Sequence, residues 1–576
     1  MKRFFSFPLF FVSTIITAFL HLVILPALAE ETAKDNALQT ALALNYCHAS
    51  LCKIISYNDR IVLEEEYSNI INNINLTKIQ DEEVINLLKG LMDTISFFKL
   101  AEGDKERFFK EYERQVANAL YSSFSGVTNI IYTGGANPYT MAATLLVQIG
   151  GAYGNYRNNM ETYRKNLDEK LWKLEKDTII QLNDNRKDFL TSYWRLMKEY
   201  SMPDKWRLTE KQMENYVNVL KDKDLDRKVR QLERIEQDFE AYPPFWYYFG
   251  QAAQEIKKYD LASQAYQEFE RIRKGFFRED HFYSSVLMNK IALLDTQKDR
   301  DLILQYLEKM TNESPSDWRK NLFAAIKYSE LQKYDEATEL LSINIDNQKN
   351  VSLNTRILGD LYLMKNDRKG AQSLLDRMIN EDNIKNQDIL YLVGKMPELK
   401  KLNKMRDQII NIDVDIDESI FGNDDLIFSV PDKWVLDDVA TFKVTMNFEG
   451  KKLHPTQFDT NKANRLVNFR FEKAIDAGDF ITNKRSADIS FDLSHPSNPI
   501  KLVGELEVTT GEKEKGYVDK GIDTVKGLST KIWKSEKAEK PEDKKTGGII
   551  VFKKREIITN GNRYRISEDN NIVKFE

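Results

Sequence analysis

Two cysteines, Cys47 and Cys52, are the first residues whose type and spacing suggest chemistry, and His48 lies between them. In an oxidising compartment an isolated cysteine pair indicates a disulfide. Residues five apart on a regular helix exceed the Cα separation of about 7 Å that a bridge tolerates, so a disulfide here requires an irregular turn. Free thiols are the alternative, and a metal site lacks a fourth ligand. We predict a Cys47–Cys52 disulfide and no metal.

Histidine is the usual general base near neutral pH, and the chain beyond residue 29 has only four, at positions 48, 281, 454 and 495. None has a catalytic partner nearby in sequence. The sequence also contains no phosphate-binding glycine loop, zinc-protease helix or nucleophile elbow. A hydrolase built on paired carboxylates stays open as an alternative, because 89 Asp and Glu residues supply candidates. We predict no enzymatic activity, no catalytic residues and no cofactor.

The length and composition of the chain limit the kind of protein that carries these residues. A length of 576 residues favours three or four domains. Hydrophobic residues make up 42% and charged residues 30% of the sequence, which favours globular domains over an integral membrane protein. The net charge of −5 lacks the positive surface that binds phosphates, so we expect no nucleic acid partner.

The N-terminus has the composition of a secretory signal peptide. Lys2 and Arg3 precede an apolar stretch from Phe4 to Pro26, and the small residues of Ala27–Ala29 follow it. We therefore predict a signal peptide over residues 1–29 and a periplasmic or secreted protein. The alternative is an uncleaved segment that anchors the chain in the envelope, because the apolar stretch is long enough to span a bilayer.

Residues 30–203 have the apolar spacing of helices, and this predicted helical domain includes an unusual segment. No charged side chain occurs from Gln115 to Tyr156, and a turn-like Gly134–Pro138 divides the segment into two apolar arms, which predicts a helical hairpin. Small residues spaced four apart let helix backbones approach closely, in membranes and in soluble cores alike. The hairpin is therefore either a buried core element or a membrane-inserting one, and the layout resembles that of helical pore-forming toxins. The residues of interest are Gly126, Ala142, Leu146, Gly150 and Gly154.

Residues 204–400 contain a recurring pattern. In the first unit the pattern consists of Trp246, Phe249, Gly250, Tyr259, Ala262, Tyr266 and Phe269. The positions equivalent to Gly250 are Ile291, Ala325 and Gly359, of which the last three follow a 34-residue period. The segment resembles the tetratricopeptide repeat, a helix–turn–helix unit with small residues between its helices. The second unit is degenerate, because Ile291 and Ile303 replace small residues.

This resemblance implies a stack of helix pairs whose first helices line a groove for an extended peptide or a helix. Transferring the groove-facing pattern of the family position by position gives a predicted set of partner-binding residues. The predicted groove residues are Tyr247, Gln251, Gln254, Met288, Arg319, Arg356 and Asp360.

The C-terminal third changes from helical to alternating periodicity. Isoleucine and valine alternate with polar residues from Ile410 to Asp417, and further strand-like runs separated by turn residues follow up to Val508. Residues 405–510 therefore predict a β-sandwich of immunoglobulin-like type. Residues 511–576 predict a linker rich in Lys and Glu, followed by terminal strands.

The sequence thus predicts a multidomain, mainly α protein, composed of a helical bundle and a tetratricopeptide-like α-solenoid, with a C-terminal β-sandwich. The function that these features favour is an exported scaffold that binds another protein or peptide through the repeat groove. The alternative is a membrane-active protein that uses the hairpin at residues 115–156.

Overall fold

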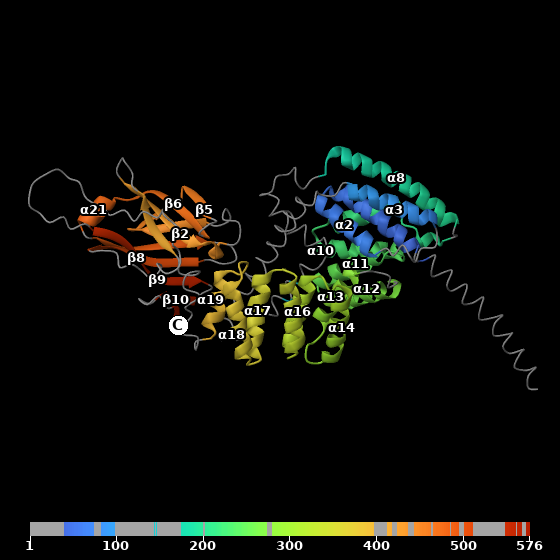
Figure 1. Ribbon diagram of the computed structural model, residues 1–576. Coiled ribbons are helices and arrows are strands. Elements are labelled where there is room, and N and C mark those ends of the chain that lie inside the picture. Colours follow the sequence, from blue (N-terminus) through green and yellow to red (C-terminus); the bar gives the residue numbers. More distant parts are fainter. Residues whose placement is uncertain are drawn as a thin grey trace, which may run out of the picture. The chain divides into compact units, whose positions relative to one another are not determined.

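The computed structural model describes part of the chain (Figure 1). The predicted signal peptide, residues 511–547 of the predicted linker and terminal strands, and the hairpin positions Gly126, Ala142, Gly150 and Gly154 lie outside the described residues. The described residues are 38, 40–73, 82–97, 143, 146, 174–199, 202–273, 279–396, 412–417, 423–435, 443–461, 465–483, 485–494, 500–510, 548–559, 562–566 and 572–575.

The chain forms two compact units. One unit contains Met1–Tyr112 and Ala143–Ala324, and the other contains Glu113–Ala142 and Ala325–Glu576. The described residues are mainly helical up to residue 396 and are mostly β-strands after it. This confirms the predicted order of a long helical part followed by strands.

The first unit is built around a helix over residues 40–57, whose residues 40–54 are buried on every side. Asn58, with φ at 51°, separates it from the next helix. Asn45 holds the helix in place: its Nδ2 donates to the carbonyls of Trp206 and Ala241 at 2.7 and 2.8 Å, and its Oδ1 accepts from Tyr193 at 2.7 Å. The surrounding helices are α2 (Arg60–Asn73), α3 (Glu82–Phe97), α8 (Lys176–Glu199), α9 (Glu210–Leu220) and α10 (Leu225–Ile235).

The following helices come in consecutive pairs at the positions of the predicted repeats. The first unit contains α11 (Pro243–Glu255), α12 (Tyr259–Ile272), α13 (His281–Leu293) and α14 (Arg300–Glu313). The helix α15 (Trp318–Glu330) begins in the first unit and ends in the second, which continues with α16 (Tyr334–Asp346), α17 (Val351–Met364), α18 (Arg368–Asn380) and α19 (Asn386–Gly394). Helices therefore occur where the repeat pattern predicts them.

Three of these pairs turn in the same way. Lys257, Gln332 and Asn366 are each the middle residue of a short connection between paired helices, and each has a positive φ, at 62°, 58° and 59°. A left-handed residue at this point lets the backbone reverse direction within a few residues. The degenerate pair differs, because residues 294–299 form a longer connection between α13 and α14.

Among the described residues, the strands of the second unit form two antiparallel sheets. The four-stranded sheet has the order β1-β2-β6-β5, and the seven-stranded sheet has the order β11-β10-β9-β8-β7-β3-β4. The strands are β1 (Asp413–Asp417), β2 (Asp424–Pro431), β3 (Lys443–Phe448), β4 (Lys451–Leu453), β5 (Gln457–Asn461), β6 (Leu466–Ile475), β7 (Ser486–Ser494), β8 (Ile500–Thr510), β9 (Gly548–Thr559), β10 (Asn562–Ile566) and β11 (Ile572–Phe575).

The two sheets touch through aromatic side chains, since Phe428 of β2 stacks on Phe491 of β7 with ring centroids 3.6 Å apart. The immunoglobulin-like type stays a prediction, and the strand order differs from it in one respect. The five consecutive strands from β7 to β11 are neighbours in one sheet, whereas the sheets of an immunoglobulin domain combine strands from separate parts of the chain. The antiparallel pairing of β8 with β9 also brings the terminal strands into the larger sheet.

Hydrogen bonds join the helices of the second unit to its sheet region. The hydroxyl of Tyr564 on β10 donates to the Leu390 carbonyl of α19 at 3.1 Å. Lys433 donates to the carbonyl of Ile379 at 3.1 Å, close to the end of α18. These bonds fix the sheet region to the last helices and help to explain why both belong to one compact unit (Figure 1).

The predicted disulfide is wrong. Cys47 and Cys52 are both buried and free, and both lie within the helix over residues 40–57. Five residues along a helix advance about 7.5 Å and rotate about 140°, so the two side chains leave the helix on different sides. The irregular turn that a bridge requires does not occur here.

The uncharged hairpin is described at only two positions. Leu146, one of its predicted packing residues, is fully buried. Within the described part of the chain, no helix is long and apolar enough to cross a membrane.

Candidate partner-binding site

The predicted groove residues lie on the first helices of the pairs, as expected, but most of them are not accessible. Gln254 and Arg319 are partly exposed. The buried ones are Tyr247, Gln251, Met288, Arg356 and Asp360. A buried side chain cannot contact a partner unless its neighbours move, so these five do not line an open groove in this structure.

In the first unit, the chain's own N-terminal helices lie against α11. The Lys53 ammonium on the helix over residues 40–57 lies 5.3 Å from the ring centroid of Tyr248 and 3.1 Å from Glu66 Oε1 of α2. Tyr247 packs edge-on against Tyr248, with centroids 5.1 Å apart, and against Phe282 at 5.4 Å. Tyr247 is therefore part of the aromatic core.

In the second unit, Arg356 and Asp360 of α17 anchor α19. The guanidinium of Arg356 lies 3.6 Å from Asp388 and stacks 3.9 Å from the ring centroid of Tyr391. Asp360 accepts hydrogen bonds from the Tyr391 hydroxyl at 2.8 Å and from Lys395 at 2.7 Å. These side chains join two helices instead of presenting a binding surface.

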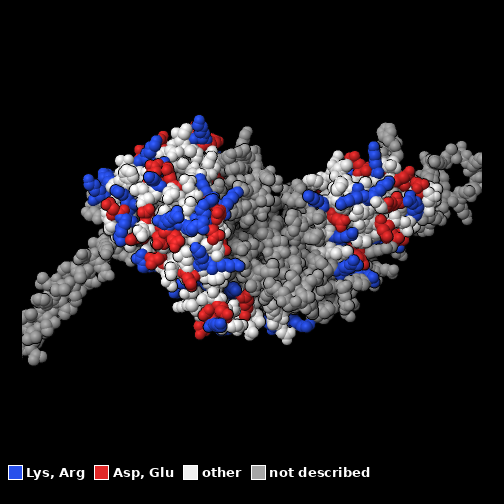
Figure 2. Space-filling model, turned by 180° about the vertical axis from the view of Figure 1, so that it is seen from behind, with Lys and Arg blue, Asp and Glu red and all other residues white. Residues whose placement is uncertain are grey.

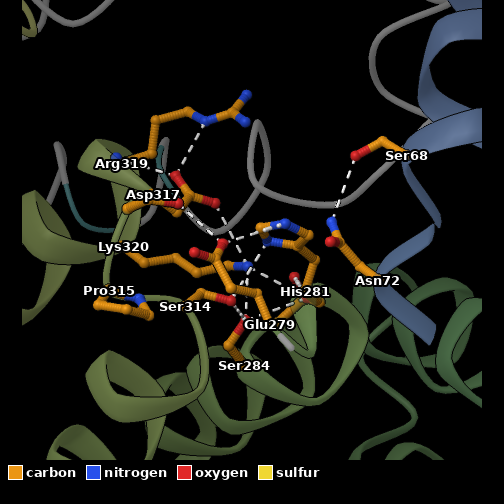
Figure 3. A network of polar contacts seen from close by, with 12 residues as sticks. Ser68, Asn72, Glu279, His281, Ser284, Ser314, Pro315, Asp317, Arg319 and Lys320 are labelled. Atoms are coloured by element: carbon orange, nitrogen blue, oxygen red, sulfur yellow. Dashed lines mark hydrogen bonds and ion pairs between the residues drawn. The ribbon is translucent and has the colours of Figure 1, made fainter. Parts of the chain in front are cut away.

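A network of polar side chains connects the starts of α13 and α15 (Figure 3). Ser314 Oγ lies 3.2 Å from His281 Nδ1 and 2.8 Å from Ser284 Oγ. Lys320 Nζ donates to Ser284 Oγ at 2.6 Å and to the His281 carbonyl at 3.1 Å, and it pairs with Asp317 at 3.3 Å. Figure 3 shows these side chains converging on one another.

The network resembles a catalytic relay in its residue types, because Glu279 lies 3.5 Å from His281 Nε2 and a serine lies on the other ring nitrogen. Burial lowers the pKa of His281 to about 4, and the nearby Lys320 charge adds to this effect. Ser284 and Ser314 have no exposed surface. In this conformation both serines are closed to solvent, and the network joins α13 to α15.

Sequence reasoning did not identify Lys320, and no local signal marks it. Its side chain is almost fully buried, and burial lowers its pKa. A lysine in the first turn of a helix is ordinarily solvated. Its role depends on Ser284, which lies in another helix, and that contact is invisible in a single sequence.

Three carboxylates, Asp59, Glu65 and Glu66, interact at the start of α2, and the charge of Arg319 on α15 also acts on Glu65. Burial raises the pKa of Glu65 to about 8, and the charges of Glu66 and Asp59 add to the rise, whereas Arg319 and Lys53 oppose it. Glu65 is therefore largely protonated at neutral pH in the folded chain.

An open hollow of about 410 Å³ lies between α8 and the start of α9. Trp194 of α8 contributes an indole that is 45% exposed. The lining residues are Trp194, Arg207, Thr209, Glu210, Lys211 and Glu214. Among the described residues, this hollow combines an accessible aromatic side chain with charges of both signs.

A scan against protein-family models found no match, and a search of curated proteins found no similar protein. On the face seen in Figure 2, basic and acidic side chains intermingle over the described residues.

Proposed function

We propose that this chain is an exported scaffold that binds another protein through tetratricopeptide-like helix pairs, followed by a β-sandwich. The observation that carries the proposal is the common turn at Lys257, Gln332 and Asn366. The last two are separated by the 34-residue period of that repeat family. Stacked helix pairs leave an extended surface, and such repeats use it to hold other proteins.

Close packing within the pairs supports the repeat assignment. A Cβ added to Gly250 of α11 would lie 2.4 Å from the Tyr266 ring of α12, so a small residue is required where the two helices meet. The alanines at the equivalent positions of the second helices, Ala262, Ala337 and Ala371, are fully buried. These are the contacts that the repeat family forms between its paired helices.

Export rests on the sequence of residues 1–29. Because the five buried groove residues belong to the core, we assign partner contact to accessible positions instead. Gln254 and Arg319 lie on the first helices of their pairs and are partly exposed. The Nε of Arg319 lies 3.4 Å from Asp317 Oδ1, and its side chain is partly exposed, so a carboxylate of a partner can also bind this guanidinium.

The test is site-specific photocrosslinking of the full-length chain in its native cell envelope. A photoreactive phenylalanine analogue replaces Gln254 or Arg319, and Glu233, an exposed residue of α10, serves as the matched control position. We expect adducts of one common mass at Gln254 and Arg319 that untagged chain competes away. Adducts of equal yield at Glu233, or none at either test position, would refute the proposal for this surface.

A further inference from the structure

Trp194 is exposed on a helix that buries most of its other large apolar side chains. Leu190, Tyr193, Leu196 and Met197 of α8 are all buried, whereas Trp194 is 45% exposed. The helix runs along the outside of its unit (Figure 1). Tryptophan is enriched among residues that dominate the binding energy of protein interfaces, because its large flat surface gains much from desolvation.

The wall opposite Trp194 is rigid. Thr209 and Gln212 form a reciprocal capping box, in which the Thr209 amide donates to Gln212 Oε1 at 2.8 Å and the Gln212 amide donates to Thr209 Oγ1 at 3.3 Å. Arg186 of α8 pairs with Glu210 of α9, which joins the two sides of the hollow. A preformed wall reduces the entropy lost when a partner binds.

The charged side chains that line the hollow differ in how closely they are paired within the chain. Glu210 is neutralised by Arg186, and this leaves Arg207, Lys211 and Glu214 facing the space. Arg207 Nε is buried and has no acceptor among the described residues, and Arg207 Nη2 lies 3.8 Å from Asp204 Oδ1. The guanidinium therefore lacks a close acceptor, and because the Arg207 side chain is 40% exposed, a carboxylate of a partner can bind its terminal nitrogens Nη1 and Nη2.

From this arrangement we propose that the hollow receives one apolar or aromatic side chain of a partner protein, which stacks on Trp194, with an adjacent carboxylate of the same segment bound by Arg207 and Lys211. The inference rests on the proposed function, because it names the chemistry of the protein that the scaffold holds. The volume of about 410 Å³ is at the lower end of the range for ligand pockets and suits a single large side chain.

The experiment pans a random peptide library on the full-length chain and measures the selected peptides by fluorescence anisotropy. We expect enrichment of an aromatic or large aliphatic residue flanked by Asp or Glu. The variant Trp194→Ala should weaken binding by about tenfold or more, as expected for a central interface residue. The control Tyr259→Ala removes an aromatic side chain that is 50% exposed on α12, and should leave the affinity unchanged.

A charge reversal distinguishes recognition from folding. Arg207→Glu should abolish binding of the acidic peptides, and repeated panning on this variant should select Lys or Arg flanks instead. Arg230→Glu, at an exposed position of α10, should preserve the original preference. Thermal melting of each variant checks that the fold is intact.

Selection of basic flanks on the unaltered chain, or unchanged affinity in both Trp194→Ala and Arg207→Glu, would overturn the inference. Photocrosslinks at Gln254 and Arg319 report on the proposed function separately. If they persist while the peptides show no dependence on Trp194, the scaffold proposal stands and the assignment of the hollow fails.

Discussion

The close approach of α11 and α12 gives a sharp test of the paired-helix packing. Replacing Gly250 with alanine places a Cβ 2.4, 2.7 and 3.0 Å from Cε1, Cδ1 and Cζ of Tyr266. Carbon atoms pack best at about 3.5 to 4.0 Å, so the ring or the helix must move by about 1 Å. Tyr266 is fully buried and has little space to move into.

The position of the Tyr266 ring is also fixed by its hydroxyl. This group donates to Gln254 Oε1 at 2.7 Å and accepts from Asn289 Nδ2 at 2.9 Å. Overpacking costs about 1 to 3 kcal/mol, and weakening of the hydrogen bonds adds about 1 kcal/mol. The higher helix propensity of alanine offsets about 1 kcal/mol of this destabilisation. We therefore expect Gly250→Ala to lower the free energy of unfolding by about 1 to 3 kcal/mol.

Gly90 provides the matched control, because it lies within α3 and a Cβ there meets no atom within 4 Å. Gly90→Ala should stabilise the chain by about 1 kcal/mol through helix propensity alone. The assay is urea unfolding followed by circular dichroism at 222 nm. In a Tyr266→Leu background, Gly250→Ala should cost nothing further. A gain in stability for Gly250→Ala equal to that of Gly90→Ala, or an undiminished cost in the Leu background, would refute the packing account.

Three further predictions concern buried polar groups. Lys320→Met should cost about 3 kcal/mol in urea unfolding, because it breaks a buried charge pair. Lys333→Met, which removes an exposed pair, should change stability by less than about 0.5 kcal/mol. Glu65 keeps its proton up to about pH 8 when folded but releases it near pH 4.5 when unfolded, so stability falls as pH rises between these values. Glu65→Gln should flatten that fall, and an unchanged pH profile would contradict the raised pKa of Glu65. Cys47 and Cys52 should both be alkylated after denaturation without reductant, as mass spectrometry would show, because neither forms a disulfide.

Local patterns predicted the helices and strands well, because each depends on residues close together in the sequence. The period of Ile291, Ala325 and Gly359 indicated paired helices, and all three residues lie in first helices of their pairs. The alternation from Ile410 to Asp417 likewise indicated the strand β1. In such cases the residue types of a helix or strand indicate by themselves which of its faces is buried.

Strand connectivity was less predictable, since it depends on pairing between distant segments. Short strands separated by turns are compatible with many strand orders in a sheet. The pairing of β8 with β9 in the structure is what places the terminal strands in the larger sheet. The disulfide failed for a related reason. Cysteine spacing suggested a bridge, but Cys47 and Cys52 lie in one regular helix, whose residues 40–54 are all buried.

The predicted groove residues show one property that a single sequence does not indicate, which is whether a helix face is exposed. Transferring a family pattern placed Tyr247 and Arg356 on the correct helices, but whether a helix face is open depends on what else the chain supplies to cover it. Lys53 lies almost two hundred residues before Tyr248 and still packs over its ring. Tyr391 does the same for Arg356. Because these faces are part of the core, a partner must recognise side chains that the chain leaves uncovered, and the exposed indole of Trp194 beside Arg207 meets that condition.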